Sequence, residues 1–375
     1  MTATATARRL AEFTPAHRVI SLYLDLDPAQ FATPDGRTSE VTSLLDGAGR
    51  HVDEDESLNH EQRISLREDL GRLREYLEDP PTKGVRALAI FSCAADGLFE
   101  TVTLTRPVPM RVVIGSRPYI EPLIGAGLQR RWLVALVSKR TARFLTGDGE
   151  LLDEHQKLKD RVHGQHSQGG WSQANYQRSV EDEAEHHFQR VAELLGERWR
   201  TEHFDRLALG GTSEDVARLE PKLDGQTRTG LLDMRVSVEV EHATLEQVGD
   251  AMRELVEEDA RRREHDALEQ LRAGVGTDGH ATGGPEQTIV ALNEHRVSTL
   301  LLAPDFNRDG GRCPSCGLLA VEPDGHCPVD DTPLERVELR EATVEAAVIQ
   351  DADMLFVTRY PDLGPFQGIG ALTRF

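Results

Sequence analysis

The chain is poor in cysteine, in aromatic residues and in positive charge. It has 4 cysteines in 375 residues, 5% aromatic residues, and 43 Lys and Arg against 64 Asp and Glu, so its net charge is −21. So few cysteines exclude a disulfide framework. The acidic balance excludes a general nucleic-acid coat, because phosphate contacts are supplied mainly by Lys and Arg.

Long apolar runs are also missing. No segment approaches the ~20 apolar residues of a membrane span, and the N-terminal MTATATARRLAEF has no apolar run typical of a signal peptide. We therefore expect a cytoplasmic protein without a membrane partner.

The length and the segment pattern predict several mixed domains. Typical domains have roughly 100 to 200 residues, so 375 residues predict two or three of them. Helical and strand-like segments are both plentiful, which predicts the α/β class with mixed α+β modules. We place an N-terminal mixed α/β domain at residues 1–127, a middle domain at 128–275 and a C-terminal α/β domain at 276–375. The glycine-rich GVGTDGHATGG separates the last two.

Alternation and helical periodicity locate the main elements. Strands are expected at RVISLYLDLDP, VRALAIFSC, LFETVTLT, MRVVIGS, DRLALGG, MRVSVEVE, VSTLLLA and MLFVT, and a two-stranded hairpin at RRWLVALVSKRTARFLTGDGEL. Helices are expected at about 61–78, 179–203, 213–220, 244–273 and 340–350. Ser179 with Asp182 is a predicted cap, Thr244 with Gln247 a predicted capping box, and Pro285 a further helix start.

Three of the four cysteines crowd into CPSCGLLAVEPDGHCPVDD. The CPSC spacing can turn two thiolates toward one ion, and CPVD repeats that shape with an aspartate in its fourth position. Zinc accepts Cys and, less often, Asp in tetrahedral sites, so Cys313, Cys316, Cys327 and Asp330 form a candidate structural zinc site. His326 competes as a ligand, although it adjoins Cys327 and would strain the knuckle. The alternative is a ribbon that has lost its fourth cysteine and binds metal weakly or not at all.

Residues 163–178 read HGQHSQGGWSQANYQR and contain no acidic residue. From residue 130 to 180 the local charge is 9 − 5 = +4, against −21 for the whole chain. A basic hairpin beside a helix N-terminus can receive a phosphate backbone, because Arg and Lys supply charge and first-turn N–H groups supply donors.

The same stretch has residues suited to positioning a water molecule. Gly169 and Gly170 allow close backbone approach, and a glutamine amide can orient a water or stabilise an oxyanion, although it is no strong base. By these residues alone, an ordinary surface loop is the alternative.

The stretch QGGWSQANYQRSVEDEAEHHFQRVAELL resembles the Gly-Gly-Gln loop and following helix of the archaeal and eukaryotic class-one release factors. It is more similar still to the Gly-x-x-Gln form, here Gly170-Trp171-Ser172-Gln173, of the Vms/ANKZF-type peptidyl-tRNA hydrolases and their bacterial relatives. The C-terminal GIGALTRF and a knuckle inserted in the third domain are also similar to archaeal release factors. The resemblance covers residues 130–375 well and the first 127 weakly.

This resemblance implies a three-domain protein that enters the ribosomal A site. Gln173 would help water to attack the ester between a nascent peptide and tRNA, and Gly169 and Gly170 would give the loop its conformation. Its implied partners are the ribosome, peptidyl-tRNA and a translational GTPase, and it implies no catalytic cofactor. The candidate contacts to tRNA or ribosomal RNA are Arg178, Lys139, Arg140 and Arg143.

Two departures from the family pattern shape the hypothesis. Trp171 and Ser172 separate the glycines from Gln173, which leaves Gln168 or Gln177 as an alternative functional amide. The first domain lacks the Asn-Ile-Lys-Ser motif that release factors use near the stop codon, which favours codon-independent rescue of stalled ribosomes over codon-specific termination.

Other functions stay open at this point. The bond that breaks could lie at the tRNA 3′ end instead of the ester. The alternative function is a non-catalytic hibernation factor that occupies the A site, and the third possibility is a degenerate release-factor scaffold with a different partner.

Overall fold

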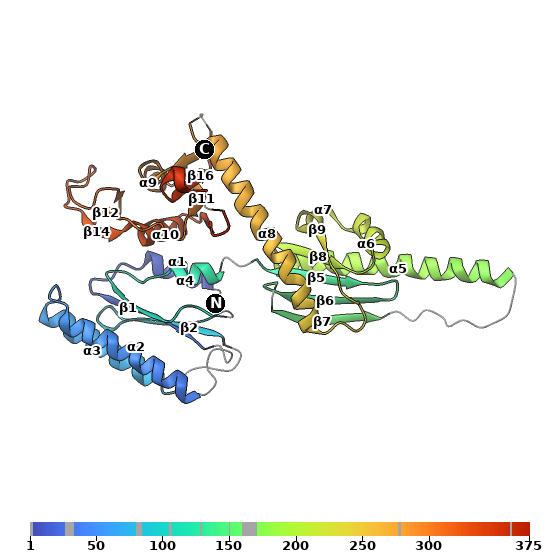
Figure 1. The fold of residues 1–375 in the computed structure, drawn as a ribbon, viewed down its shortest axis with the longest axis horizontal. Helices are drawn as coiled ribbons and strands as arrows, with labels where there is room; N and C mark the ends of the chain where they lie inside the picture. The colour runs from blue at the N-terminus through green and yellow to red at the C-terminus, as the bar shows by residue number, and fades with distance from the viewer. Residues whose placement is uncertain are drawn as a thin grey trace. The chain divides into compact units, whose positions relative to one another are not determined.

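The computed structural model describes residues 3–26, 34–79, 85–104, 107–127, 130–149, 151–159, 171–276, 279–360 and 362–375. Helices and strands alternate along the chain, which confirms the predicted mixed α and β class (Figure 1). The chain forms two compact units: Met1–Leu128 together with Glu264–Phe375, and Gln129–Arg263. The three-domain division at residues 127/128 and 275/276 stays a prediction.

The N-terminal part of the first unit is an antiparallel sheet covered on both faces. Its strands are β1 (Val19–Asp25), β2 (Ala87–Cys93), β3 (Leu98–Leu104) and β4 (Arg111–Gly115), in the order β3-β2-β1-β4. Apolar residues of α2 (Pro34–Glu54) and α3 (His60–Tyr76) pack on one face. Residues of α1 (Ala3–Glu12) and α4 (Glu121–Gly127) pack on the other. Both strand faces are apolar, so alternate residues of β1 and β2 enter different cores.

The C-terminal part of the same unit has two small sheets. The first has the order β10-β16-β11-β15, with β10 (Ala281–Gly283), β11 (Val297–Leu302), β15 (Asp353–Phe356) and β16 (Ile369–Thr373). Helices α9 (Pro285–Asn293) and α10 (Leu339–Ile349) cover one face. The second sheet has the order β13-β12-β14, with β12 (Asp309–Arg312), β13 (Leu319–Ala320) and β14 (Glu335–Glu338). The predicted cysteine knuckle lies within this second sheet.

The N-terminal and C-terminal parts of this unit share one apolar core. Leu10 of α1 and Ile120 beside α4 belong to the same buried cluster as Val344 of α10. A buried carboxylate accompanies that contact: the Arg312 guanidinium lies 2.7 Å from Glu345, and Arg117 lies 3.6 Å from it. The two parts are therefore held together by apolar burial and by charges that pair across it.

We expect the Glu341→Gln variant to be more stable than the wild type at alkaline pH. Burial and the neighbouring carboxylates of Glu345 and Glu338 raise the pKa of Glu341 to about 8. A raised folded-state pKa gives stability that is complete below the unfolded pKa near 4.5 and is lost as the pH rises through 8. The substitution should raise the free energy of unfolding by about 1 to 3 kcal/mol at pH 8.5 and much less at pH 5.

Urea unfolding at both pH values measures this difference. Glu335→Gln is the matched control, because Glu335 lies nearby with an exposed side chain. Equal effects of Glu341→Gln at the two pH values would contradict the assignment.

The second unit is a three-layer arrangement of helices around one mixed sheet. Its strands are β5 (Trp132–Val137), β6 (Thr141–Gly147), β7 (Leu152–Lys159), β8 (Arg206–Gly210) and β9 (Leu231–Val236), in the order β7-β6-β5-β8-β9. Strands β5, β8 and β9 are parallel, and β6 and β7 form an antiparallel edge. Helices α5 (Trp171–Glu202) and α6 (Ser213–Leu219) cover one face, and α8 (Leu245–Gly274) covers the other.

Most predicted elements of this unit are confirmed, with three differences. The strand expected at residues 234–241 is β9, which begins earlier and ends at Val236. The Thr244 and Gln247 capping box is present, each side chain accepting from the other residue's backbone N–H. The predicted start of the amphipathic helix at residue 179 is wrong, because α5 begins at Trp171. Ser179 therefore lies inside α5 and cannot be its N-cap. The expected two-stranded hairpin has a third strand, β7, whose alternating polar residues hide it from an apolar pattern.

No helix in the described part of the chain is both long enough and apolar enough to cross a membrane.

Candidate functional site

The predicted site residues of the second unit centre on the start of α5. Gln173 is the third residue of this helix, which spans Trp171–Glu202. Gly169 and Gly170 lie outside the described residues, and so does Gln168. Arg178 lies in the second turn of α5, and the structure does not describe its side chain or those of Gln173 and Gln177. The structure therefore places the Gln173 backbone at a helix N-terminus, where first-turn N–H groups have no partner within the helix.

Helix α5 is anchored through its C-terminal two thirds. Of its described side chains, Ala184 is the first that is buried, and the buried apolar ones that follow it include Phe188, Val191, Ala192 and Leu195. These side chains pack against Leu133, Ala135 and Phe144 of the sheet. Their three- and four-residue spacing is the apolar stripe that the sequence shows.

Basic residues gather at the β5–β6 turn. Lys139 and Arg140 lie exposed in this turn, and the register pairs Thr141 with Lys159 of β7. Lys139 is paired with Glu214 at 2.9 Å. Within the described part of the chain, neither Arg140 nor Lys159 has an ion pair. Strand β7 therefore brings Lys159 to the predicted basic turn. Because the sequence pattern did not indicate this strand, Lys159 was not among the predicted RNA contacts.

Arg143, a predicted phosphate contact, is buried in the structure. Its side chain is 6% exposed, and its Nε and Nη2 donate to the two carboxylate oxygens of Glu154 at 3.0 and 2.7 Å. Its Nη1 donates to the backbone carbonyls of Val240 and Ala243 at 3.2 and 2.7 Å. The hydrogen bond from Arg143 holds the pKa of Glu154 below its usual range. Arg143 thus ties the β6–β7 edge to the segment before α8, and an alternating strand pattern does not reveal such burial.

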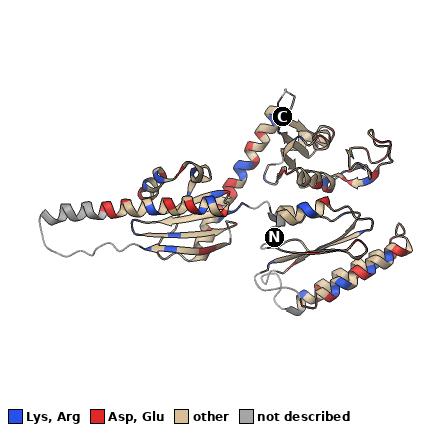
Figure 2. Cartoon of the chain, turned by 180° about the vertical axis from the view of Figure 1, so that it is seen from behind, with Lys and Arg blue, Asp and Glu red and all other residues tan. Residues whose placement is uncertain are grey.

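Charges on the rest of this unit are mixed in sign. Acidic and basic side chains alternate along α8 (Figure 2), where Arg261 and Arg262 pair with Glu257 and Glu258. Exposed pairs of this kind leave little net field beyond a Debye length. The turn with Arg140 and Lys159 therefore presents two exposed cations that have no ion pair among the described residues.

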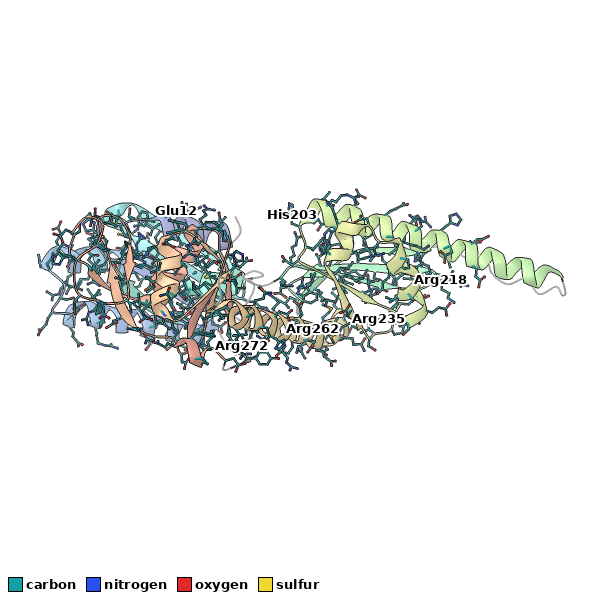
Figure 3. All side chains as sticks on the ribbon, turned by 90° about the horizontal axis from the view of Figure 1, so that it is seen from above. Glu12, His203, Arg218, Arg235, Arg262 and Arg272 are labelled. Atoms are coloured by element: carbon teal, nitrogen blue, oxygen red, sulfur yellow. The ribbon has the colours of Figure 1, made fainter. Side chains whose placement is uncertain are left out.

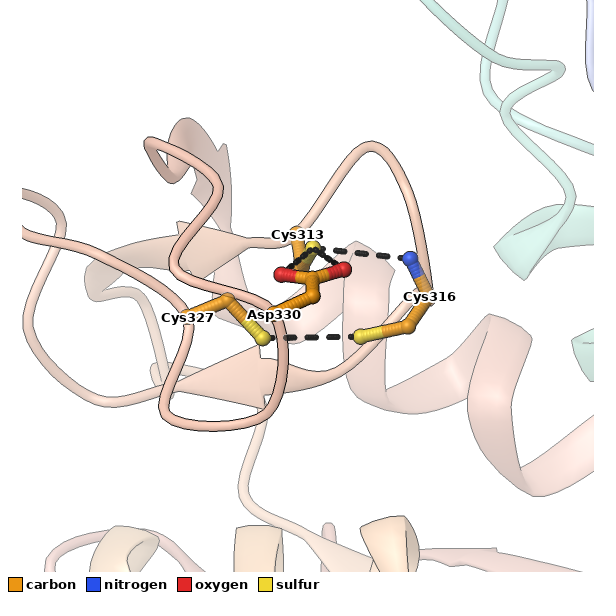
Figure 4. A group of neighbouring side chains, drawn as sticks. All are labelled: Cys313, Cys316, Cys327 and Asp330. Atoms are coloured by element: carbon orange, nitrogen blue, oxygen red, sulfur yellow. Dashed lines mark hydrogen bonds between the residues drawn. The ribbon is translucent and has the colours of Figure 1, made fainter.

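The three predicted cysteines and the aspartate come together in the C-terminal part of the other unit (Figure 4). The candidate ligand atoms of Cys313, Cys316, Cys327 and Asp330 all lie within 4.8 Å of one another. The Cys316 and Cys327 sulfurs are 3.5 Å apart, and Cys313 Sγ lies 3.5 Å from Asp330 Oδ1. The competing His326 does not belong to this group.

These distances fit a tetrahedral metal site. A zinc–sulfur bond of about 2.3 Å places two thiolates roughly 3.7 Å apart around a tetrahedral ion. Backbone N–H groups of Cys316 and Val329 donate to Cys313 and Cys327 sulfurs at 3.4 Å each, which stabilises thiolates. Four protein ligands in this geometry leave no open position for chemistry, so the cluster can hold a metal ion in a structural role.

Comparison with known proteins gives two sequence matches. Residues 118–273 match the bacterial archaeo-eukaryotic release factor family 10. Peptide chain release factor subunit 1 of Archaeoglobus fulgidus is 25% identical over 340 residues, which cover 82% of this chain and 81% of that protein.

Solved structures give matches of low similarity. An archaeal translation termination factor is 17% identical, with 100% of this chain and 99% of that chain covered and a TM-score of 0.27. Archaeoglobus fulgidus Pelota is 13% identical, with 77% and 79% covered and a TM-score of 0.34. The family match across residues 118–273 and the similarity to a release factor along most of the chain support membership of the archaeo-eukaryotic release factor superfamily.

Proposed function

We propose that this protein is a ribosome-associated peptidyl-tRNA hydrolase that frees nascent chains from stalled ribosomes without reading a codon. The observation that supports it most is the match of residues 118–273 to a release-factor family, because this segment contains Gln173 and the whole of α5. The relative from Archaeoglobus fulgidus is itself named as a peptide chain release factor.

The proposed reaction is ester hydrolysis. Water attacks the carbonyl carbon that joins the peptide to tRNA, the peptide leaves with a carboxyl group, and the tRNA 3′ oxygen leaves as a hydroxyl. The Gln173 amide, which both donates and accepts hydrogen bonds, orients that water, while Gly169 and Gly170 let the chain approach the ester closely. Free N–H groups at the start of α5 add favourable dipoles for a developing oxyanion.

Nucleic-acid contacts are assigned to the basic turn and to α5. Lys139, Arg140 and Arg178 contact tRNA or ribosomal RNA phosphates, and Lys159 extends this surface along β7. Arg143 is left out, because its guanidinium is buried against Glu154 and two carbonyl oxygens. Absence of the Asn-Ile-Lys-Ser motif supports action that does not depend on a codon, as in the Vms-type hydrolases.

The remaining assignments concern partners and metal. The protein enters the ribosomal A site with three domains and a translational GTPase as helper. Zinc at Cys313, Cys316, Cys327 and Asp330 stabilises the C-terminal knuckle and takes no part in the reaction.

We expect Arg140→Ala and Arg143→Ala to fail in different ways. Arg140→Ala should weaken ribosome binding and leave the melting temperature unchanged. The slope of the logarithm of the binding constant against the logarithm of the salt concentration should fall by about one, which corresponds to one phosphate contact. Arg143→Ala should reduce the free energy of unfolding by about 3 to 5 kcal/mol, because it leaves Glu154 and buried carbonyls without their partner. Ribosome co-sedimentation over a salt series and urea unfolding measure the two effects. A stable Arg143→Ala protein that no longer binds ribosomes would restore Arg143 as an RNA contact.

Peptide release from stalled nascent-chain ribosomes tests the proposed function. Incubation with the purified protein should convert peptidyl-tRNA to free peptide and intact deacylated tRNA. A tRNA shortened at its 3′ end would move the cleavage to that end. Ribosome binding without any release would favour the hibernation factor instead, and failure to co-sediment at low salt would overturn both.

A further inference from the structure

Glu185 of α5 holds this helix to its neighbours through two ion pairs. Its Oε1 accepts from Arg218 Nε and Nη2 at 2.9 and 2.8 Å, and its Oε2 lies 2.6 Å from Lys222 Nζ. Arg218 projects from α6 beside α5 (Figure 3), and Lys222 ends the short helix η2 (Glu220–Lys222). Hydrogen bonds from Lys222 and Arg218 lower the pKa of Glu185. One oxygen of the Glu185 carboxylate thus contacts α6, and the other contacts η2.

Apolar contact supports the same junction. The Arg218 guanidinium lies 5.3 Å from the ring centre of Phe188, which is fully buried one turn after Glu185. Arg218 therefore contacts α5 at two successive turns, once through charge and once through an aromatic ring. Apolar packing alone is weakly directional, whereas hydrogen bonds depend on the direction in which donor and acceptor face each other.

The position of Glu185 along α5 means that a small change of helix direction there moves Gln173 by a larger distance. Gln173 precedes it by 185 − 173 = 12 residues of continuous helix, which is about 18 Å at 1.5 Å per residue. Ala184, the first buried described side chain of α5, lies next to Glu185. A change of about 10° in helix direction at this point moves the start of the helix by roughly 3 Å. Misplacement of about 1 Å is enough to slow catalysis strongly.

We propose that Glu185, paired with Arg218 and Lys222, is a positioning residue that sets the direction of α5 and thereby the place of Gln173. The inference rests on the proposed hydrolase function. It assigns Glu185 no contact with the substrate. The pairs are partly exposed, with 44% of the Glu185 side chain accessible, so they are expected to add little to global stability.

A distance measurement tests the helix direction without any substrate. Nitroxide labels are introduced through unnatural amino acids at Ala174 in α5 and Asp153 in β7, which avoids the native cysteines. Glu185→Gln should broaden the distance distribution between them. Glu197→Gln is the matched control, since Glu197 lies exposed on the same helix and has no ion pair among the described residues.

Peptide release supplies the second readout. Glu185→Gln should lower kcat about tenfold with little change in the half-saturating ribosome concentration, because the basic turn with Lys139, Arg140 and Lys159 is untouched. Glu197→Gln should keep the wild-type kcat. An unchanged distance distribution or an unchanged kcat in Glu185→Gln overturns the proposal. Absence of release by the wild type would instead overturn the hydrolase function, and full release by Gln173→Ala would overturn only the role of Gln173, so these failures are distinguishable.

Discussion

Replacement of Gln173 by alanine is expected to slow peptide release by about 10² to 10³-fold, while ribosome binding stays close to the wild-type value. Loss of one preorganised hydrogen-bonding group at a developing oxyanion costs this much in other acyl-transfer enzymes. The amide is neutral and contributes little to long-range attraction, so binding should depend on the basic residues instead. The predicted effect therefore appears in kcat and hardly in the half-saturating ribosome concentration.

Two further glutamines provide matched controls for this prediction. Gln177 lies four residues later in the same helix, and Gln168 precedes the glycine pair. Gln177→Ala and Gln168→Ala should each keep release within about threefold of the wild type, which is less than 1 kcal/mol. Single-turnover release with excess protein, together with co-sedimentation, measures both properties. A loss in Gln168→Ala or Gln177→Ala, with Gln173→Ala active, would transfer the role to that amide.

The start of α5 bears on the sequence spacing between the glycine pair and Gln173. Trp171 and Ser172 separate the glycines from Gln173, and in the structure both belong to the helix. Gln173 therefore sits in the first helical turn, with its backbone fixed by the helix. A residue fixed in this way depends on the direction of the whole helix, which gives Glu185 and its partners their importance.

Local patterns predicted those elements whose signals lie within a few residues. The capping box of Thr244 and Gln247, the helix start at Pro285 and the alternating apolar strands all depend on neighbours in the chain. Helix α2 escaped prediction because its apolar residues are few and glycines interrupt it. Strand β7 was not predicted because it lies at a sheet edge and most of its residues are polar.

In the candidate site, contacts between residues far apart in the chain could not be predicted from the sequence either. In the sequence, Lys139, Arg140 and Arg143 look equivalent in a basic hairpin. In the structure Lys139 and Arg140 are exposed, whereas Arg143 is buried. Arg143 points toward the segment before α8, about a hundred residues later in the chain, and donates hydrogen bonds to two backbone carbonyls there. The cysteine cluster was predictable because all four candidate ligands lie within 18 residues and their spacing carries the geometry.

The second large effect is expected from removal of the metal. The knuckle is built on strands of four, two and four residues, β12, β13 and β14, and such short strands bury little apolar surface of their own. Cys313 and Cys327 are 1% and 2% exposed and lie among few other buried side chains of this small sheet. We therefore expect metal binding to supply much of the local folding free energy. Loss of a ligand should open this sheet and leave the larger sheet with β11 and β16 intact.

We expect the wild type to contain one zinc ion per chain by elemental analysis, and Cys313→Ala to contain none. Without the metal, amides of β12 and β14 should lose at least about 10³-fold protection against hydrogen exchange, because a structural zinc contributes several kcal/mol. Cys93→Ala is the matched control, since Cys93 is buried in β2 outside the cluster and should leave the zinc content unchanged. Asp330→Asn should reduce zinc retention in the presence of a chelator, whereas His326→Ala should not. Wild-type protein that carries no zinc after purification without chelator would refute the metal assignment, and zinc loss in His326→Ala alone would make that histidine the fourth ligand.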